Sequence, residues 1–280
     1  LLKEGKVPPD KRVAFSPKQC ADIMKSYPDI SFYAQPSRHR CFLDSVYKKN
    51  GVILSDDLSM CDIIMGVKEV PINMLIDNKV FFFFSHTIKK QPYNKLLLKS
   101  ILKKKIQLVD YETLVGPDKK RIIGFGRYAG IVGSYNSFLT YGKKTTKYDL
   151  KPPQLLKDKK ALYKELKKVI LPKNFKIILT GSGRVANGAI EILEELGIRQ
   201  ISGADFLEQI FDYPTYVQLD SLDYNQRIDN TLGSKKDFYI HSNKYKSVLL
   251  KYTRFANMLI TGHYYSPGSP IILSKEDINN

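Results

Sequence analysis

The segment FKIILTGSGRVANGAIEILEELGI, residues 175–198, constrains the fold more than any other part of the chain. Its apolar run at 175–180 predicts a buried strand, and the spacing of apolar residues after 184 predicts an amphipathic helix that stops at Gly197. A GxGxxA turn lies between them. Strand, turn and helix in this order present backbone N–H groups and a helix N-terminus to a pyrophosphate. The segment predicts a dinucleotide-binding βα unit, with a purely structural βα turn as the alternative.

This motif gives each small residue a separate task. Gly181 permits the tight turn, Gly183 permits close approach of a phosphate, and Ala186 permits close packing of the helix. The cofactor-binding residues predicted from the turn are therefore Gly181, Ser182, Gly183, Arg184, Val185 and Ala186.

Two further cofactor-binding residues follow from the general layout of such domains. An acid that binds the ribose is expected roughly 20 residues beyond the turn, where the chain offers Asp205 after a short predicted strand. This choice leaves NAD and NADP both open. Later, ANMLITGHYYSPGSP predicts a strand that runs into a polar loop. His263 in this loop is expected to face the cofactor, with an ordinary loop histidine as the alternative.

Strands and helices alternate along most of the chain. The opening, residues 1–17, is expected to form a strand and a loop before a helix with Ser16 as its N-cap. Further helices are predicted at 44–51, 93–105 and 162–170, and strands at 30–36, 61–67, 79–85 and 106–112. Such alternation predicts an α/β protein with largely parallel sheets. With 280 residues, 43% of them hydrophobic, the chain is long enough for two moderate cores.

A glycine-rich stretch, IGFGRYAGIVGSYNSFLTYG, separates two parts of this pattern. Gly126, Ala129, Gly130 and Gly133 would let a helix approach another backbone closely. Tight helix packing and a hinge helix between domains both fit this composition. The lysine-rich residues 143–160 that follow are expected to form a surface connection.

The net charge of +17 raises the question of a polyanionic partner. The lysines are scattered over turns and polar helix faces rather than gathered in a stripe with aromatic residues, so a solvated surface is favoured over a nucleic-acid site. The three cysteines lack CxxC spacing, and no metal site is predicted. No apolar run reaches the roughly 20 residues that span a bilayer, and no signal peptide is visible. A cytoplasmic location is the simplest expectation.

Several segments together resemble one protein family. DKRVAFSP, IIMGVKEVP, FFFFSHTIKKQPYN, LVDYETL and FGRYAGIVG precede GSGRVANGA in the order found in the alanine dehydrogenase and transhydrogenase superfamily. The chain is most similar to the lysine-forming saccharopine dehydrogenase branch. This resemblance implies two Rossmann-like domains with an interdomain cleft, and a second domain that is incomplete at its C-terminus. The expected division is 1–125 for the substrate and catalytic domain, 126–160 for a hinge helix and linker, and 161–280 for the NAD(P)-binding domain.

The resemblance also implies roles for residues outside the glycine-rich turn. Lys68 and His86 match the acid–base pair of the family, and Arg12 matches an arginine that binds a substrate carboxylate. Glu69 and Glu112 match acidic residues that line the substrate site and tune its charge. We also consider Arg127 a cleft residue, with a surface charge on the hinge helix as the alternative.

The function implied by the resemblance is oxidative cleavage of a secondary amine. An NAD- or NADP-dependent enzyme of this type converts saccharopine to lysine and 2-oxoglutarate by hydride transfer to nicotinamide. Alanine dehydrogenase-like deamination is one alternative, and a non-catalytic nucleotide- or polyanion-binding relative is another. The expected partner is a small amino-acid substrate rather than a membrane or nucleic acid, and a homo-oligomer is compatible with the family.

Overall fold

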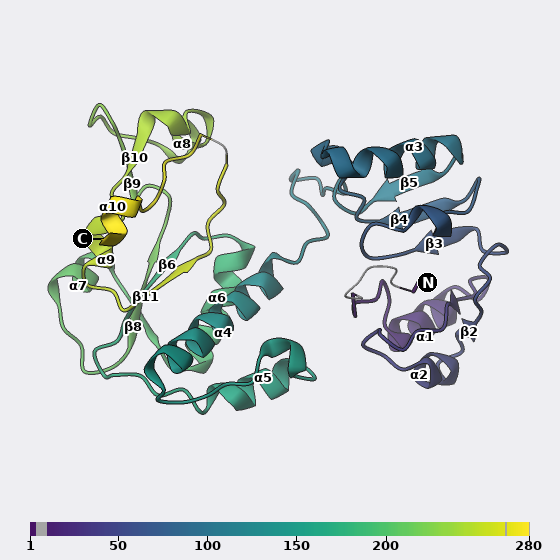
Figure 1. The fold of residues 1–280 in the computed structure, drawn as a ribbon, viewed down its shortest axis with the longest axis horizontal. Helices are drawn as coiled ribbons and strands as arrows, with labels where there is room; N and C mark the ends of the chain where they lie inside the picture. Colours follow the sequence, from purple (N-terminus) through teal and green to yellow (C-terminus); the bar gives the residue numbers. More distant parts are fainter. Residues whose placement is uncertain (4–9, 267, 280) are drawn as a thin grey trace. The chain divides into compact units, whose positions relative to one another are not determined.

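A computed structural model describes residues 1–3, 10–266 and 268–279 of the protein (Figure 1). The chain divides into two compact units, Leu1–Gly124 and Phe125–Asn280. Residues 126–160, expected to form a separate hinge and linker, are part of the second unit. Within the described residues, no helix combines the length and apolarity needed to cross a membrane.

The first unit contains parallel strands covered by short helices. Strands β3, β4 and β5 form a parallel sheet in that order, while β1 and β2 form a separate parallel pair (Figure 1). The strands are β1 (Tyr33–Ala34), β2 (Ile53–Leu54), β3 (Ile63–Met65), β4 (Val80–Phe83) and β5 (Gln107–Asp110). The helices are α1 (Pro17–Ser26), α2 (Asp44–Lys49) and α3 (Lys95–Lys103), with 3₁₀ turns at Ile72–Met74, Thr87–Lys89 and Pro92–Asn94.

Local sequence signals explain where these helices begin and end. Ser16 caps α1 by accepting a hydrogen bond from the Gln19 backbone N–H, and the Gln19 side chain accepts one from the Ser16 N–H in return. Pro17 occupies the first turn, where its missing N–H costs nothing. Gly51, just beyond α2, has a φ of +83° that ends the helix without steric penalty.

Strand β4 explains the run of four phenylalanines. Phe81 and Phe83 are fully buried and point to one face of the sheet, where they pack with Leu97 and Ile101 of α3. Phe84, the residue after β4, is 3% exposed. The run therefore fills the core of the first unit and continues to the end of the strand.

The predicted opening strand is not found in the described part of residues 1–17. Residues 1–3 and 10–16 contain no assigned strand, and residues 4–9 lie outside the described residues. The Leu2 N–H nevertheless donates to the Met65 carbonyl at 2.9 Å, and the Leu1 carbonyl accepts from the Gln35 N–H at 3.0 Å, so the first residues bond to the backbone beside β3 and β1 without being assigned as a strand.

The second unit is built on a four-stranded parallel sheet with the order β11-β6-β8-β7 (Figure 1). Its strands are β6 (Lys176–Thr180), β7 (Arg199–Ile201), β8 (Thr215–Leu219) and β11 (Met258–Thr261), and an antiparallel pair joins β9 (Asn225–Arg227) to β10 (Tyr245–Ser247). The helices are α4 (Gly126–Thr145), α5 (Lys159–Leu166), α6 (Arg184–Glu195), α7 (Gly203–Glu208), α8 (Lys235–Ile240), α9 (Leu250–Thr253) and α10 (Lys275–Asn279), with 3₁₀ turns at Pro153–Leu155 and Ser242–Lys244.

Every residue of β6 is buried because both faces of the sheet are covered. Ile177 and Leu179 pack in one cluster with residues of α4 and α6. Ile178 faces the opposite cluster, which contains Phe206 of α7 and Tyr252 of α9. This two-sided burial is typical of parallel sheets, and the predicted α/β class with parallel sheets is confirmed.

Helices α4 and α6 approach each other backbone to backbone, at glycines of both helices. A Cβ on Gly130 would lie 1.9 Å from the Val185 carbonyl oxygen, and one on Gly188 would lie 1.9 Å from the Arg127 carbonyl oxygen. Gly133, also expected at such a contact, has nothing within 4 Å of the position of a Cβ. Of the two interpretations of the glycine-rich helix, tight packing is the one that these contacts support.

Candidate functional site

The glycine-rich turn connects β6 to α6 and has the strained geometry that its sequence predicts. Gly181 has a φ of +92°, and a Cβ there would lie 2.8 Å from the Gly262 carbonyl oxygen. Its N–H donates to the Leu219 carbonyl at 2.8 Å, and its carbonyl accepts from the Gln218 side chain at 2.9 Å. Any side chain at residue 181 would therefore meet both strain and a backbone clash.

Gly183 supplies the open space and the helix end that a phosphate requires. Nothing lies within 4 Å of the position of a Cβ on Gly183, which is the N-cap of the 12-residue helix α6. Gly183 offers no side chain to cap this helix end, and the N-terminus of a helix attracts an anion. Ala186 is fully buried and contributes packing rather than a ligand contact. These residues fit a dinucleotide pyrophosphate.

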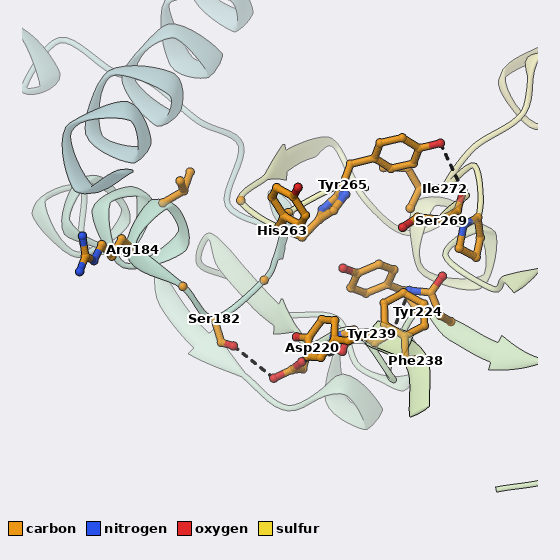
Figure 2. A pocket seen from close by; sticks show the side chains of 18 residues that line it. Ser182, Arg184, Asp220, Tyr224, Phe238, Tyr239, His263, Tyr265, Ser269 and Ile272 are labelled. Atoms are coloured by element: carbon orange, nitrogen blue, oxygen red, sulfur yellow. Dashed lines mark hydrogen bonds between the residues drawn. The ribbon is translucent and has the colours of Figure 1, made fainter. Parts of the chain in front are cut away.

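A cavity of about 420 Å³ opens beside this turn (Figure 2). Five of the six cofactor residues predicted from the turn line it together with His263, whereas Ala186 does not. The lining residues are Gly181, Ser182, Gly183, Arg184, Val185, Asp220, Ser221, Tyr224, Asn225, Phe238, Tyr239, Gly262, His263, Tyr264, Tyr265, Ser269, Pro270 and Ile272.

The sheet order places an acid at the cavity that the sequence analysis missed. In a simple winding, the strand that follows α6 would lie beside β6, but here β7 lies at the edge and β8 pairs with β6 instead. Thr180 of β6 pairs with Leu219 of β8, so Asp220 follows the neighbouring strand at the level of the glycine turn. In dinucleotide folds, the acid that binds ribose ends this neighbouring strand. The available signal was the short apolar run TYVQL directly before Asp220.

Asp220 carries its charge in a network of donors. The Ser182 hydroxyl donates to its Oδ2 at 3.3 Å, as Figure 2 shows, and Lys235 lies 2.6 Å from the same oxygen. Burial raises the pKa of the Asp220 carboxyl, but hydrogen bonds from Lys235 and Ser221 outweigh burial and leave the pKa below its ordinary value. The side chain is therefore an ionised acceptor at neutral pH.

Asp205, predicted as the ribose acid, does not line this cavity. It lies in the first turn of α7, where its carboxylate accepts hydrogen bonds from the Ser202 hydroxyl at 2.7 Å and the Gln209 side chain at 2.6 Å. The prediction was misplaced because it assumed that the next strand in sequence is also the next strand in the sheet.

His263 follows β11 and lines the cavity as predicted. Its Nδ1 forms a hydrogen bond of 2.6 Å with the hydroxyl of the fully buried Thr180, and its ring lies 5.6 Å from that of Tyr224. Burial lowers the pKa of His263 below 6.5. The imidazole is therefore neutral at physiological pH and can exchange a hydrogen bond with a ligand without adding charge.

In the first unit, His86 follows β4 and pairs with Glu69. The distance from His86 Nδ1 to Glu69 Oε1 is 2.6 Å, and the two side chains are 14% and 9% exposed. A carboxylate only accepts hydrogen bonds, so this contact assigns the proton to Nδ1 and leaves the Nε2 lone pair of a neutral ring available as a base. His86 has a φ of +54°, a left-handed conformation that few residues other than glycine adopt.

The Phe84 ring brings Lys68 and His86 together. The Lys68 Nζ lies 5.8 Å from the centre of the Phe84 ring, and the His86 ring stacks on Phe84 with centroids 6.4 Å apart. Tyr111, after β5, contacts the same phenylalanine edge to face at 5.3 Å. Phe84 was not predicted as a site residue, because a buried phenylalanine in a strand is typical of a core.

Arg12 pairs with Asp10, and the charge of Lys68 acts on the same Asp10 carboxylate. The Arg12 Nε donates to Asp10 Oδ1 at 2.8 Å and to Oδ2 at 3.1 Å. Burial raises the pKa of Asp10, but hydrogen bonds from Arg12 and the charges of Arg12 and Lys68 outweigh burial and lower it. Asp10 therefore interacts electrostatically with both Arg12 and Lys68, the two cations predicted to act on the substrate.

Glu112 forms a second acidic centre after β5. Its Oε1 lies 3.3 Å from both Lys89 Nζ and Arg121 Nη2, and the side chain is 9% exposed. Its Oε2 is buried and has no hydrogen-bond partner among the described residues. Arg127, by contrast, lies on α4 and forms a two-pronged ion pair with Glu191 of α6, which also binds Lys159 at 2.7 Å. This contact favours the interpretation of Arg127 as a surface charge.

Comparison with known proteins shows what the sequence of this chain is similar to. Residues 1–132 match the family described as "Alanine dehydrogenase/PNT, N-terminal domain". The mouse mitochondrial alpha-aminoadipic semialdehyde synthase is 27% identical over 96% of this chain and 31% of its own length. Saccharopine dehydrogenase [NAD(+), L-lysine-forming] of Candida glabrata is 25% identical over 68% of this chain and 55% of its own length.

A solved structure supports the fold over nearly the whole chain. An L-alanine dehydrogenase matches with a TM-score of 0.58 at 13% identity, covering 99% of this chain and 69% of that one. The alpha-aminoadipic semialdehyde synthase of Arabidopsis thaliana is 26% identical over 97% of this chain and 29% of its own length. The chain thus spans less than a third of these two synthases. Residues 1–132 thus match the N-terminal domain family of alanine dehydrogenase and PNT, and the chain is similar to saccharopine dehydrogenase and alpha-aminoadipic semialdehyde synthase.

Proposed function

We propose that the protein is a nicotinamide-dependent amino-acid dehydrogenase of saccharopine dehydrogenase type. The reaction consumes saccharopine, water and an oxidised nicotinamide dinucleotide, and yields lysine, 2-oxoglutarate and the reduced dinucleotide with a proton. The observation that carries the proposal is the contact of Lys68 and His86 with one Phe84 ring. Homology to amino-acid dehydrogenases supports the reaction class.

In this proposal Lys68 takes the proton of the secondary amine. An ordinary lysine is protonated at neutral pH, and a base requires the neutral amine, which loss of water around the site on substrate binding would favour. A carboxylate such as that of Glu69 stabilises the protonated form of a nearby lysine, but this carboxylate is already bound to His86 at 2.6 Å. The acid–base task of Lys68 is therefore compatible with an acidic neighbour.

His86 activates the water that adds to the substrate imine. With the proton on Nδ1 held by Glu69, Nε2 accepts a proton from water and later returns one to the departing lysine amine. Arg12 binds a substrate carboxylate through its planar pair of donors. The substrate carboxylate then shares this guanidinium with Asp10 or displaces it, since Asp10 occupies it here.

The second unit would bind the dinucleotide cofactor. Gly181 and Gly183 allow the pyrophosphate to approach the start of α6, and Asp220 and His263 line the cavity in which the rest of the dinucleotide would lie. When bound, the dinucleotide accepts the hydride that the amine carbon loses. Every other step falls to the residues of the chain itself.

The test follows the absorbance of the reduced dinucleotide with purified protein. There are three substrate sets: lysine plus 2-oxoglutarate with reduced dinucleotide, saccharopine with oxidised dinucleotide, and alanine with oxidised dinucleotide. Each set is measured with the NAD and the NADP form. We expect turnover with the first two sets and a loss of about 100-fold or more in kcat for His86→Gln. His39→Gln removes an exposed histidine and is the matched control. Turnover of alanine alone would favour the alanine-type reaction, and no turnover in any set would refute the proposal.

A further inference from the structure

We propose that Asp110 is a positioning residue, which holds His86 in its working orientation through the Ser85 hydroxyl. This inference rests on the proposed function, because it concerns the histidine of that same site. Asp110 is the last residue of β5 and is 7% exposed. It pairs across the sheet with Phe83 of β4, so it lies beside the start of the loop that carries His86.

The backbone at His86 needs support from its surroundings. Its φ of +54° is in the left-handed region, which residues other than Gly, Asn and Asp seldom adopt. Such a conformation persists where the surrounding structure holds it. His86 lies between Ser85, which is fully buried, and Thr87, which begins the 3₁₀ turn Thr87–Lys89. The orientation of the imidazole therefore depends on how these two neighbours are fixed.

The Ser85 hydroxyl fixes both neighbours at once. Its proton is donated to Asp110 Oδ2, because an ionised carboxylate only accepts hydrogen bonds. The Ser85 oxygen accepts a hydrogen bond from the Thr87 N–H at 3.1 Å, and the Thr87 hydroxyl lies 2.7 Å away and must donate as well. The one donor and two acceptor sites of this hydroxyl are thus all used. Both sides of His86 are tied in this way to one buried carboxylate.

The other oxygen of Asp110 holds the loop after β5. Its Oδ1 accepts from the Glu112 N–H at 2.8 Å, and the Thr113 hydroxyl donates to the Asp110 carbonyl at 3.0 Å. Glu112 in turn lies 3.3 Å from the Nζ of Lys89, in the turn that follows His86. Asp110 therefore fixes the loop that carries His86 relative to the loop that carries Glu112.

A purely local turn residue is the competing interpretation of Asp110. An aspartate or asparagine often accepts from the N–H two residues further on, as Asp110 does from Glu112. The bond from Ser85 differs because it joins two buried groups that are 25 residues apart in the chain. Asparagine has a single acceptor oxygen, so it can keep the local bond or the bond from Ser85, but not both. Asp110→Asn therefore separates the two interpretations.

The first experiment measures kcat and KM for saccharopine together with the urea midpoint of unfolding. We expect Ser85→Ala and Asp110→Asn each to lower kcat by about tenfold or more, with KM changed by less than about threefold. The double variant should lose little more than the more impaired single variant, because both changes remove the same link. Ser16→Ala is the matched control: it removes the hydroxyl that caps α1, and should lower the urea midpoint but keep kcat.

The second experiment observes the histidine itself by proton NMR of the same proteins. The Nδ1 proton that His86 shares with Glu69 at 2.6 Å should resonate far downfield, and its loss in His86→Gln assigns it. We expect this resonance to shift or broaden in Ser85→Ala and Asp110→Asn and to stay unchanged in Ser16→Ala. This measurement needs no substrate, so it reports the position of the ring separately from turnover.

The possible results separate this inference from the proposed function. Unchanged kcat and an unchanged resonance in both variants would overturn the inference and leave the dehydrogenase in place. A normal Asp110→Asn beside an impaired Ser85→Ala would also overturn it, since Asp110 would then be a local turn residue. An equal fall of kcat in Ser16→Ala would do the same, because the loss would follow stability. If the unaltered protein turns over no substrate, the proposed function fails and the inference fails with it.

Discussion

The Phe84 ring shows how one apolar side chain can organise charged ones. It is 3% exposed, yet it contacts Lys68, the His86 ring and Tyr111, which follows the neighbouring strand β5. A flat, rigid ring restricts the rotamers of the groups that pack on it, and apolar contact excludes water from an ammonium group. The reactivity of Lys68 and His86 should therefore depend on the shape of this residue and not only on its volume.

Replacing Phe84 with leucine tests this dependence. Phe84→Leu keeps an apolar residue but removes the flat surface, and we expect a loss of about 1–1.5 kcal/mol in the free energy of unfolding with a fall of at least about tenfold in kcat. Phe81→Leu is the matched control: Phe81 is fully buried in the same strand and packs with the core. It should lose similar stability, measured by urea denaturation, and keep its kcat. Equal kcat values for the two variants would contradict the role of the ring.

A pH effect is expected from His263. Burial holds its folded-state pKa below the value of 6.5, so the folded protein binds a proton less readily than the unfolded chain. The stabilisation is complete above about pH 6.5 and is lost as the pH falls from there toward the folded pKa. Urea denaturation between pH 7.5 and 5 should show this loss. His263→Gln should flatten that part of the profile, whereas the exposed His241→Gln should keep it; identical profiles for both variants would exclude His263 as the cause.

At the scale of elements, the contact between α4 and α6 determines how the glycine turn is supported. The carbonyl of Val185, in the first turn of α6, lies where a Cβ on Gly130 would be, and the carbonyl of Arg127 meets Gly188 in the same way. Val185 also lines the cavity beside the glycine turn. A change in the spacing of the two helices would therefore be transmitted directly to the predicted phosphate site.

Alanine substitutions in α4 distinguish a packing glycine from an incidental one. Gly130→Ala should destabilise the protein by about 3 kcal/mol or more, because two backbones must separate to admit a methyl group, and should weaken NADH binding. Gly133→Ala meets nothing within 4 Å and should stabilise α4 by up to about 1 kcal/mol through helix propensity. Thermal unfolding and NADH titration of both variants provide the measurement. A harmless Gly130→Ala would show that the helices are not in close contact in solution.

Elements of this chain could be predicted well because their signals are local. The Ser16 cap, Gly51 after α2 and the βα unit of 175–197 depend on residues within one or two turns of each other. The order of the strands in the sheet depends on pairing between distant segments, and no local sequence pattern predicts that order. Asp205 was chosen for this reason, and Asp220 emerged only when β8 was found beside β6.

At the scale of the whole molecule, each unit has its own core and its own group of candidate functional residues. Fully buried Phe81 and Phe83 fill the first unit, and fully buried Ile177, Ile178 and Leu179 fill the second. Composition and alternation were sufficient to predict the α/β class with parallel sheets. The roles proposed for Lys68 and His86 came from family resemblance alone, since a lysine after a strand is ordinarily a solvated residue and a phenylalanine such as Phe84 ordinarily belongs to a core.

The strand order also has a consequence for how the protein is made. Strand β6 pairs with β8 and β11, which end at Leu219 and Thr261, and with neither β7 nor any earlier strand among the described residues. A nascent chain that has emerged only as far as β7 therefore holds an unpartnered central strand with the apolar centre Ile177, Ile178 and Leu179. The glycine turn at 181 gains its contact with Leu219 only when about 40 further residues have left the ribosome. It gains its contact with Gly262 only after about 80 residues in all. Throughout that interval the exposed strand would be a natural target for chaperones.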